Sequence, residues 1–170
     1  MTSWASLLVD AEQALIDAGI ATPSVDARWI VEEVAERRDG AWVLDAENAA
    51  PPQAERRVHE LVTRRARGEP LQYVVGSWAF RDLDLLVDPR VLIPRPETEH
   101  TVEVALGEAA RLGLRAGGRG PWAGTGTTAH VADLGTGSGA IALTLATQLP
   151  DVQVWATDRS AAAIAVARAN

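Results

Sequence analysis

The sequence contains no cysteine and no lysine, so all 16 of its basic side chains are arginines. Without cysteine there are no disulfides, no thiolate zinc sites and no cysteine nucleophile. Without lysine there is no Walker phosphate-binding lysine, no Schiff base and no lysine general base. These absences narrow the chemistry that is open to the chain.

Long apolar runs and an excess of positive charge are also missing. No apolar segment reaches membrane-spanning length, and residues 1–11 lack the basic start and apolar core of a secretory signal. We therefore expect a cytoplasmic protein with no membrane partner. The formal net charge of −7 argues against a protein that coats nucleic acid, and no direct nucleic-acid substrate is expected.

The first 70 residues predict a small helical bundle. Apolar residues recur at helical spacing over residues 3–18, with Ser3 as the expected N-cap. Thr22-Pro23 predicts the start of a second helix that reaches Arg37-Arg38, and Pro51-Pro52 that of a third, which closes before Gly68 and Pro70. Because a unit of this size buries little core on its own, we expect residues 1–70 to dock against something else.

Residues 71–96 are expected to form a β-hairpin linker between two domains. Short β-prone runs occur at 73–75, 78–80 and 83–87, with Arg81-Asp82 as the turn between the last two. From Glu97 the spacing is helical again, and residues 115–128, rich in Gly, Arg and Thr, are expected to form a loop.

The last part of the chain predicts the start of a parallel α/β domain. Strands are expected at 129–134 and 152–157, and helices at 139–149 and from 160 to the end. The fold class is therefore α/β: a helical bundle, a hairpin linker, then βαβα of a Rossmann-like domain in residues 97–170. Since two parallel strands cannot bury both faces of a sheet, we expect the chain to be a truncated form of a longer protein.

The glycines at 135, 137 and 139 mark a tight turn between the first of these strands and its helix. Gly135-Thr136-Gly137-Ser138-Gly139 leaves backbone accessible, and free N–H groups at the helix start would face a nucleotide-like cofactor. The spacing Gly135-x-Gly137-x-x-Ala140 also fits the dinucleotide fingerprint, so the turn alone does not choose the cofactor. Ser138 is no hydrolase nucleophile, because G-x-S-x-G requires glycines where Thr136 and Ala140 stand; it is expected to bond the ligand or the helix start.

Two carboxylates accompany this turn. Asp158 follows Gly135 by 23 residues at the end of the second strand, where an acidic side chain commonly accepts hydrogen bonds from ribose hydroxyls. Beside the glycines this reading is preferred to a helix cap or a surface turn. Asp133 is placed to hold a ligand ammonium group through water or to cap the loop, and the sequence does not decide between them.

Histidines and arginines receive no catalytic role. His59, His100 and His130 show no ligand spacing, so no metal site is expected. A basic cluster on the third helix is interpreted as a solvated face, with contact to an acidic partner or RNA as the alternative. Its members are Arg56, Arg57, Arg64, Arg65 and Arg67.

Three blocks make the chain resemble a known family, the bacterial release-factor glutamine methyltransferases, also called HemK or PrmC proteins. They are Arg64-Arg65-x-x-Gly68-Glu69-Pro70-Leu71-Gln72-Tyr73 with Gly76 and Phe80; Val87-Asp88-Pro89 running to Leu92-Ile93-Pro94-Arg95-Pro96-Glu97-Thr98-Glu99; and Asp133-Leu134-Gly135-Thr136-Gly137-Ser138-Gly139-Ala140-Ile141-Ala142. The second block is the most specific and favours S-adenosylmethionine over NAD. Asp82 stands where the family often has glycine, and aspartate can still adopt the left-handed turn conformation.

The resemblance implies a function. S-adenosylmethionine would donate a methyl group to the side-chain amide of the glutamine in the Gly-Gly-Gln motif of peptide-chain release factors, the partners of the helical domain. Residues 135–139 would contact the cofactor, Asp158 its ribose, and Pro94, Arg95, Pro96 and Glu97 would border the site. The family's catalytic Asn-Pro-Pro-Tyr is expected beyond Asn170, so catalytic residues are unassigned and residues 1–170 alone are expected to be inactive. The alternatives are an N6-adenine DNA methyltransferase and a non-catalytic binding module.

Overall fold

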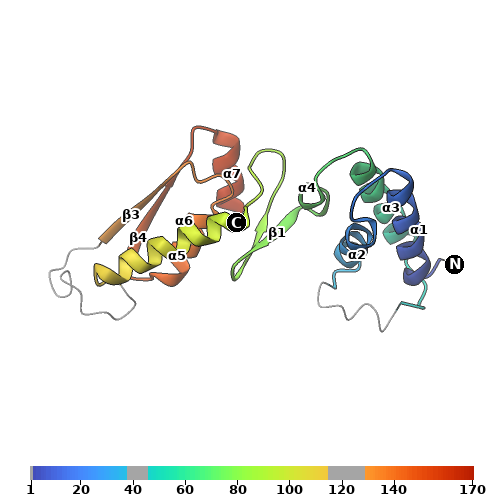
Figure 1. Cartoon of the computed structure of the whole chain (residues 1–170), viewed down its shortest axis with the longest axis horizontal. Coiled ribbons are helices and arrows are strands. Elements are labelled where there is room, and N and C mark those ends of the chain that lie inside the picture. The colour runs from blue at the N-terminus through green and yellow to red at the C-terminus, as the bar shows by residue number, and fades with distance from the viewer. Residues whose placement is uncertain (1, 38–45, 115–128) are drawn as a thin grey trace. The chain divides into compact units, whose positions relative to one another are not determined.

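A computed structural model of the chain describes residues 2–37, 46–114 and 129–170. The chain divides into two compact units, Met1–Val75 and Gly76–Asn170, each described here by itself (Figure 1). The residues expected to form a linker, 71–96, are divided between these units. The expected loop at 115–128 lies outside the described residues.

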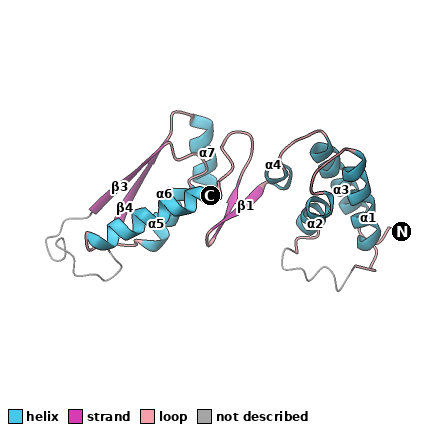
Figure 2. Ribbon diagram, in the orientation of Figure 1, coloured by secondary structure: helices cyan, strands magenta, loops and turns pink. Residues whose placement is uncertain are grey.

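The first unit is helical, as predicted (Figure 2). Its helices are α1 (Trp4–Asp17), α2 (Pro23–Val34), α3 (Pro52–Ala66) and α4 (Leu71–Val75). The predicted Ser3 cap is confirmed: its Oγ accepts from the Ser6 N–H at 3.2 Å, and the Ser6 Oγ accepts from the Ser3 N–H at 2.9 Å. The predicted end of the second helix near Arg37 is wrong, because α2 stops at Val34 and Glu36 turns to a φ of 55°.

Residues 73–75 are helical, so the predicted β-prone run there is wrong. Leu71, Val74 and Val75 of α4 are buried in the same apolar core as α1, α2 and α3. β-branched residues form strands only where a sheet partner can use them, and here the apolar core of the helices provides the burial instead. The block is therefore the last element of the helical unit.

Two arginines of α3, Arg64 and Arg65, make hydrogen bonds to other segments of this unit. Arg65 Nε donates to Asp26 Oδ2 at 2.6 Å, and the Asp26 side chain, only 4% exposed, also accepts from Thr22. Arg64 donates to both oxygens of Glu69 and to the Tyr73 and Val74 carbonyls. Hydrogen bonds from Arg64 lower the pKa of Glu69. The interpretation as a solvated basic face is therefore wrong for two of its five arginines.

The second unit begins with an antiparallel hairpin and a helix. Strands β1 (Ser77–Phe80) and β2 (Leu83–Leu86) pair as predicted. At their turn Arg81 adopts the left-handed conformation, with a φ of 52°, whereas Asp82 does not. The turn therefore places its left-handed residue one position before the one where the family often has glycine. Helix α5 (Pro96–Arg111) follows, with Pro96 in its first turn.

A parallel βαβα unit completes the described chain, as the sequence predicted. It consists of β3 (Ala129–Leu134), α6 (Ala140–Gln148), β4 (Val152–Thr157) and α7 (Ala161–Ala169) (Figure 1). The strands pair in parallel from Ala129↔Val152 to Leu134↔Thr157. The expected α/β fold class is therefore confirmed. In the described ranges, no helix is both long and apolar enough to span a membrane.

The core of this unit supports the start of α6. Val131 and Val154 on one sheet face pack with α5 and α6, whereas Trp155, on the other face, is 56% exposed. Ala140, the first residue of α6, packs with Phe80 and Val102 in a second cluster that joins α6 to the hairpin and α5. The turn before α6 thus rests on packed elements.

The buried pair of Arg65 and Asp26 predicts unequal effects for two arginines of α3. Arg65→Met leaves a buried carboxylate with Thr22 alone and should lower the free energy of unfolding by about 3 kcal/mol. The matched control, Arg57→Met, removes an exposed pair with Glu60 and should change it by less than about 0.5 kcal/mol. Urea unfolding followed by circular dichroism at 222 nm measures both, and equal losses would contradict a structural role for Arg65.

Candidate functional site

The glycine turn lies between β3 and α6 and is attached to the end of β4. The backbone N–H groups of Gly135 and Thr136 both donate to the Thr157 carbonyl, at 2.8 and 2.9 Å. This backbone carbonyl brings residue 158 to the side of the turn. No side-chain pattern at Thr157 signals this contact in the sequence, because the acceptor is the main chain.

Asp158 is joined directly to the turn, as its predicted partnership with the glycines requires. Its Oδ2 accepts from the Gly137 N–H at 3.0 Å, and its Oδ1 accepts from the Ser160 N–H at 2.9 Å. These hydrogen bonds, that from Ser160 first and that from Gly137 second, hold the pKa of the Asp158 carboxyl below its ordinary value. The group therefore remains ionised through the neutral range.

Asp158 is not the N-cap of α7. That position belongs to Ser160, whose Oγ accepts from the Ala163 N–H at 3.1 Å. The bond from the Ser160 N–H closes a local turn, as the surface-turn alternative requires. The bond from the Gly137 N–H is a second contact, which that alternative does not include. An ionised carboxylate offers about four acceptor sites and two are occupied here. Acceptor capacity for two further donors remains.

Asp133 and Thr136 close the loop on themselves. The Thr136 hydroxyl donates to Asp133 Oδ2 at 2.7 Å, and Thr136 is buried. The loop-capping alternative for Asp133 is therefore present in the structure. Its other oxygen, Oδ1, has no partner among the described residues, and the proposed contact with a ligand ammonium group stays a prediction.

Most N–H groups of the turn itself are already bonded within the protein, and the expectation that free N–H groups at the start of α6 face a ligand stays a prediction. Gly135, Thr136, Gly137 and Gly139 all donate internally, the last to the Thr136 carbonyl at 2.8 Å. Among the described residues, the Ser138 N–H and hydroxyl have no hydrogen-bond partner, so the expected bond from Ser138 to the helix start is absent. The turn is held by its own hydrogen bonds because a loop of glycines needs them to keep one conformation.

The three glycines serve two different needs. Gly135 and Gly137 have φ values of 86° and 55°, and a Cβ at either would meet nothing within 4 Å. Their open sides leave room for another molecule. Gly139, at a φ of 88°, is buried, and a Cβ there would lie 3.1 Å from Leu143 Cδ1 and 3.3 Å from Ala167 Cβ. Gly139 therefore permits close packing of α6 on α7, a sufficient reason for glycine without a ligand.

The predicted border residues are not joined to this turn by any hydrogen bond in the described part of the chain. Arg95 is the N-cap residue of α5 without a side-chain cap, and Arg95, Pro96 and Glu97 are exposed, whereas Pro94 is buried. Further along α5, Val102 belongs to the same apolar cluster as Ala140. Their role as a border of the site stays a prediction.

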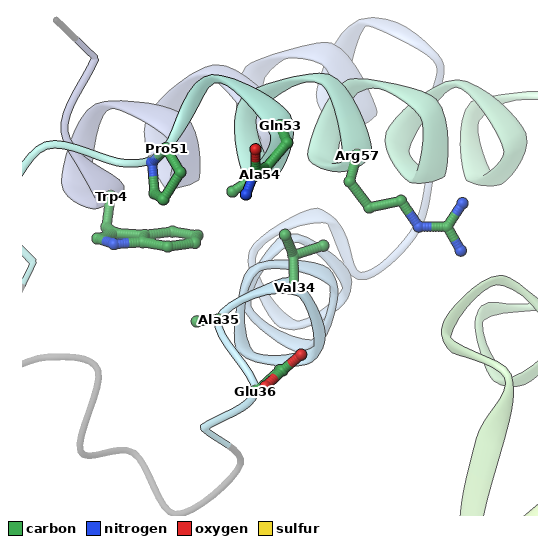
Figure 3. A pocket seen from close by; sticks show the side chains of 8 residues that line it. All are labelled: Trp4, Val34, Ala35, Glu36, Pro51, Gln53, Ala54 and Arg57. Carbon is green, nitrogen blue, oxygen red and sulfur yellow. The ribbon is translucent and has the colours of Figure 1, made fainter.

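A separate hollow of about 390 Å³ lies in the helical unit (Figure 3). It is lined by Trp4, Val34, Ala35, Glu36, Pro51, Gln53, Ala54 and Arg57, none of which was predicted as a site residue. In the described ranges no three His, Asp or Glu side chains gather as a metal site. His130 lies on the exposed sheet face and accepts from Trp155 Nε1 at 3.2 Å. The glycine turn with Asp158 thus remains the candidate site.

The lowered pKa of Asp158 predicts how the turn responds to acid. A depressed folded-state pKa stabilises the fold above the unfolded value of about 3.9, and this stabilisation is lost as the pH falls through the folded value. In two-dimensional ¹H–¹⁵N spectra, the amide signals of Gly137 and Ser160 should shift together, with one midpoint below that value. Separate midpoints, or a shared midpoint at or above about 3.9, would contradict the two hydrogen bonds from Gly137 and Ser160 to the Asp158 carboxylate.

Two family models match the chain on either side of the hairpin. The model described as the PrmC N-terminal domain matches residues 6–76, which include α1 to α4. The model described as the methyltransferase small domain matches residues 123–170, which include β3, the glycine turn and Asp158. The candidate site therefore lies in the part of the chain that matches a methyltransferase model.

Curated relatives match both parts in one alignment. The release factor glutamine methyltransferase of Deinococcus radiodurans is 37% identical over 164 residues, 96% of this chain and 54% of its own length. Those of Bordetella pertussis and Neisseria gonorrhoeae are 40% and 38% identical, over 92% and 87% of this chain and 52% and 48% of their own lengths. The chain spans about half the length of these relatives. Together with the two model matches, this similarity shows that the chain belongs to the release factor glutamine methyltransferase family.

Proposed function

We propose that this chain carries the S-adenosylmethionine site of a protein-glutamine methyltransferase. The observation that carries the proposal is the hydrogen bond between Asp158 and Gly137, which joins the glycine turn to an ionised carboxylate at the carboxyl ends of two parallel strands. This edge is where open α/β sheets bind nucleotide-like ligands. Family membership adds the class of reaction.

The residues present fit the cofactor's ribose. Asp158 has two unused acceptor sites, and two vicinal hydroxyls are two donors, so the pairing satisfies both partners. Hydrogen bonds from hydroxyls to an ionised carboxylate are shorter and stronger than those between neutral groups. An aspartate is ionised over the neutral range, and the backbone hydrogen bonds lower the pKa of Asp158 further.

The methionine part would lie along the open side of the turn. Gly135 and Gly137 leave space that any side chain would occupy, and Asp133 Oδ1 is an unused acceptor beside them for an ammonium group held through water. Bound S-adenosylmethionine supplies a methyl group on a sulfonium. The same turn and carboxylate also suit NAD, and the family of the chain favours S-adenosylmethionine.

We propose that the acceptor is the glutamine of the Gly-Gly-Gln motif in peptide-chain release factors, which the helical unit helps to engage. An amide nitrogen is a weak nucleophile, so the enzyme must align its lone pair with the methyl–sulfur bond at roughly 3 Å. In the family this task belongs to Asn-Pro-Pro-Tyr, which residues 1–170 do not contain. We also propose that the protein acts in the cytoplasm, the location expected from the sequence.

Asp158→Ala should weaken S-adenosylmethionine binding by at least about tenfold, because two charge-assisted hydrogen bonds are lost. Asp151→Ala is the matched control: this exposed aspartate precedes the opposite end of β4, about 20 Å away, and its replacement should leave the affinity unchanged. Isothermal titration calorimetry with S-adenosylmethionine and, separately, NAD measures both variants. Binding of NAD alone would overturn the choice of cofactor.

The choice of substrate needs the longer enzyme. A protein that includes this chain and the segment expected to carry Asn-Pro-Pro-Tyr should transfer one methyl group to a release factor with Gly-Gly-Gln, and none to a factor whose glutamine is replaced by asparagine. Residues 1–170 should transfer none. Mass spectrometry of the factor measures a gain of 14 Da, and methylation of a DNA oligonucleotide instead of the factor would support the adenine alternative.

A further inference from the structure

The side chain of Asn170 joins three segments that are far apart in the sequence. Its Oδ1 accepts from the Leu86 N–H at 2.7 Å, and its Nδ2 donates to the Leu86 carbonyl at 3.2 Å. The same Nδ2 donates to the Ser138 carbonyl at 2.8 Å. The end of α7, the outer edge of β2 and the glycine turn thus meet at one amide group.

The chemistry of this contact calls for a primary amide. Pairing with both the N–H and the carbonyl of one residue needs a donor and an acceptor in one plane, and the third bond needs the second hydrogen of the NH₂ group. Aspartate provides the acceptor without the donors, and leucine provides neither. Among short side chains, only asparagine makes all three bonds.

The bond to Ser138 acts on the peptide group between Ser138 and Gly139. Its carbonyl accepts from Asn170, and its N–H donates to the Thr136 carbonyl at 2.8 Å, so both ends of the peptide plane are held. Ser138 is only 3% exposed, so water does not readily replace the lost donor. One peptide group separates this plane from the peptide whose Gly137 N–H is held by Asp158.

We propose that Asn170 is a positioning residue for the cofactor turn, an inference that rests on the proposed function. Asp158 orients the peptide that carries the Gly137 N–H. Asn170 orients the peptide between Ser138 and Gly139. Together they hold the open glycines in the conformation that receives the cofactor. Through Leu86, the same amide also ties the turn to the hairpin.

The alternative is that Asn170 only completes α7, whose last turn it caps with a backbone bond to Val166. Val166→Ala separates the two roles: this residue is fully buried on α7 and bonds nothing in the turn, so its truncation weakens the helix packing alone. A structural role predicts that affinity follows stability in every variant. A positioning role predicts that cofactor affinity falls in the Asn170 variants by more than their loss of stability explains.

Asn170→Leu should weaken S-adenosylmethionine binding by about tenfold, and Asn170→Asp by at least as much, because aspartate places a negative charge beside the Ser138 carbonyl. Asn170→Gln, which keeps the amide on a longer stem, should recover part of the affinity. Val166→Ala should lower the urea midpoint while changing the affinity less than twofold. Calorimetry gives the affinities, and unchanged binding in Asn170→Leu would overturn the proposal.

Hydrogen exchange gives a readout that needs no cofactor. The Gly139 amide should exchange about tenfold faster in Asn170→Leu and Asn170→Asp than in the parent chain, with no such change in Val166→Ala beyond its global loss of stability. Faster exchange with no cofactor binding by the parent chain would refute the proposed function and leave the positioning role standing. Equal exchange at Gly139 in all variants would refute the positioning role even if the parent chain binds the cofactor.

Discussion

The candidate site depends on how the end of β4 holds the glycine turn. A run of alternating glycines has no side chains to fix its course, and its conformational freedom in the unfolded chain is large. Two N–H groups bond to the Thr157 carbonyl, and a third bonds to Asp158, so the last residue of β4 and the residue after it define the path of the turn. The parallel pairing of β3 with β4 is what brings these partners together.

This arrangement gives Asp158 two tasks that do not compete. Each oxygen of its ionised carboxylate accepts one hydrogen bond from a backbone N–H, and the second lone pair of each oxygen remains available to a ligand. The backbone bonds lower its pKa further below the neutral range, in which an aspartate of ordinary pKa already carries the charge that a ribose would need. The same group that builds the turn is thus equipped to bind a ligand beside it.

The helical unit is stabilised by polar contacts of a different kind. Because the chain has no lysine, every cation is a planar guanidinium with several donors, and Arg64 uses this to join Glu69 with two backbone carbonyls. Arg65 joins the buried Asp26 with one backbone carbonyl, that of Glu69. The spacing of this block, on which the family resemblance partly rests, therefore has a local physical basis in the connection between α3 and α4.

Local patterns in the sequence determined the secondary structure of most described elements, the Ser3 cap, the hairpin at 77–86, the parallel βαβα order and the pairing of the glycine turn with Asp158. Helix caps, hydrophobic periodicity and turn residues act within a few positions of the chain, so they can be recognised without knowledge of the fold. Only the tertiary structure decided that residues 71–75 are helical, that Arg64 and Arg65 point inward, that Gly139 is required by α7, and that Asn170 reaches the turn. Each of these depends on a partner between a few and more than eighty residues away, outside the local pattern of its own segment.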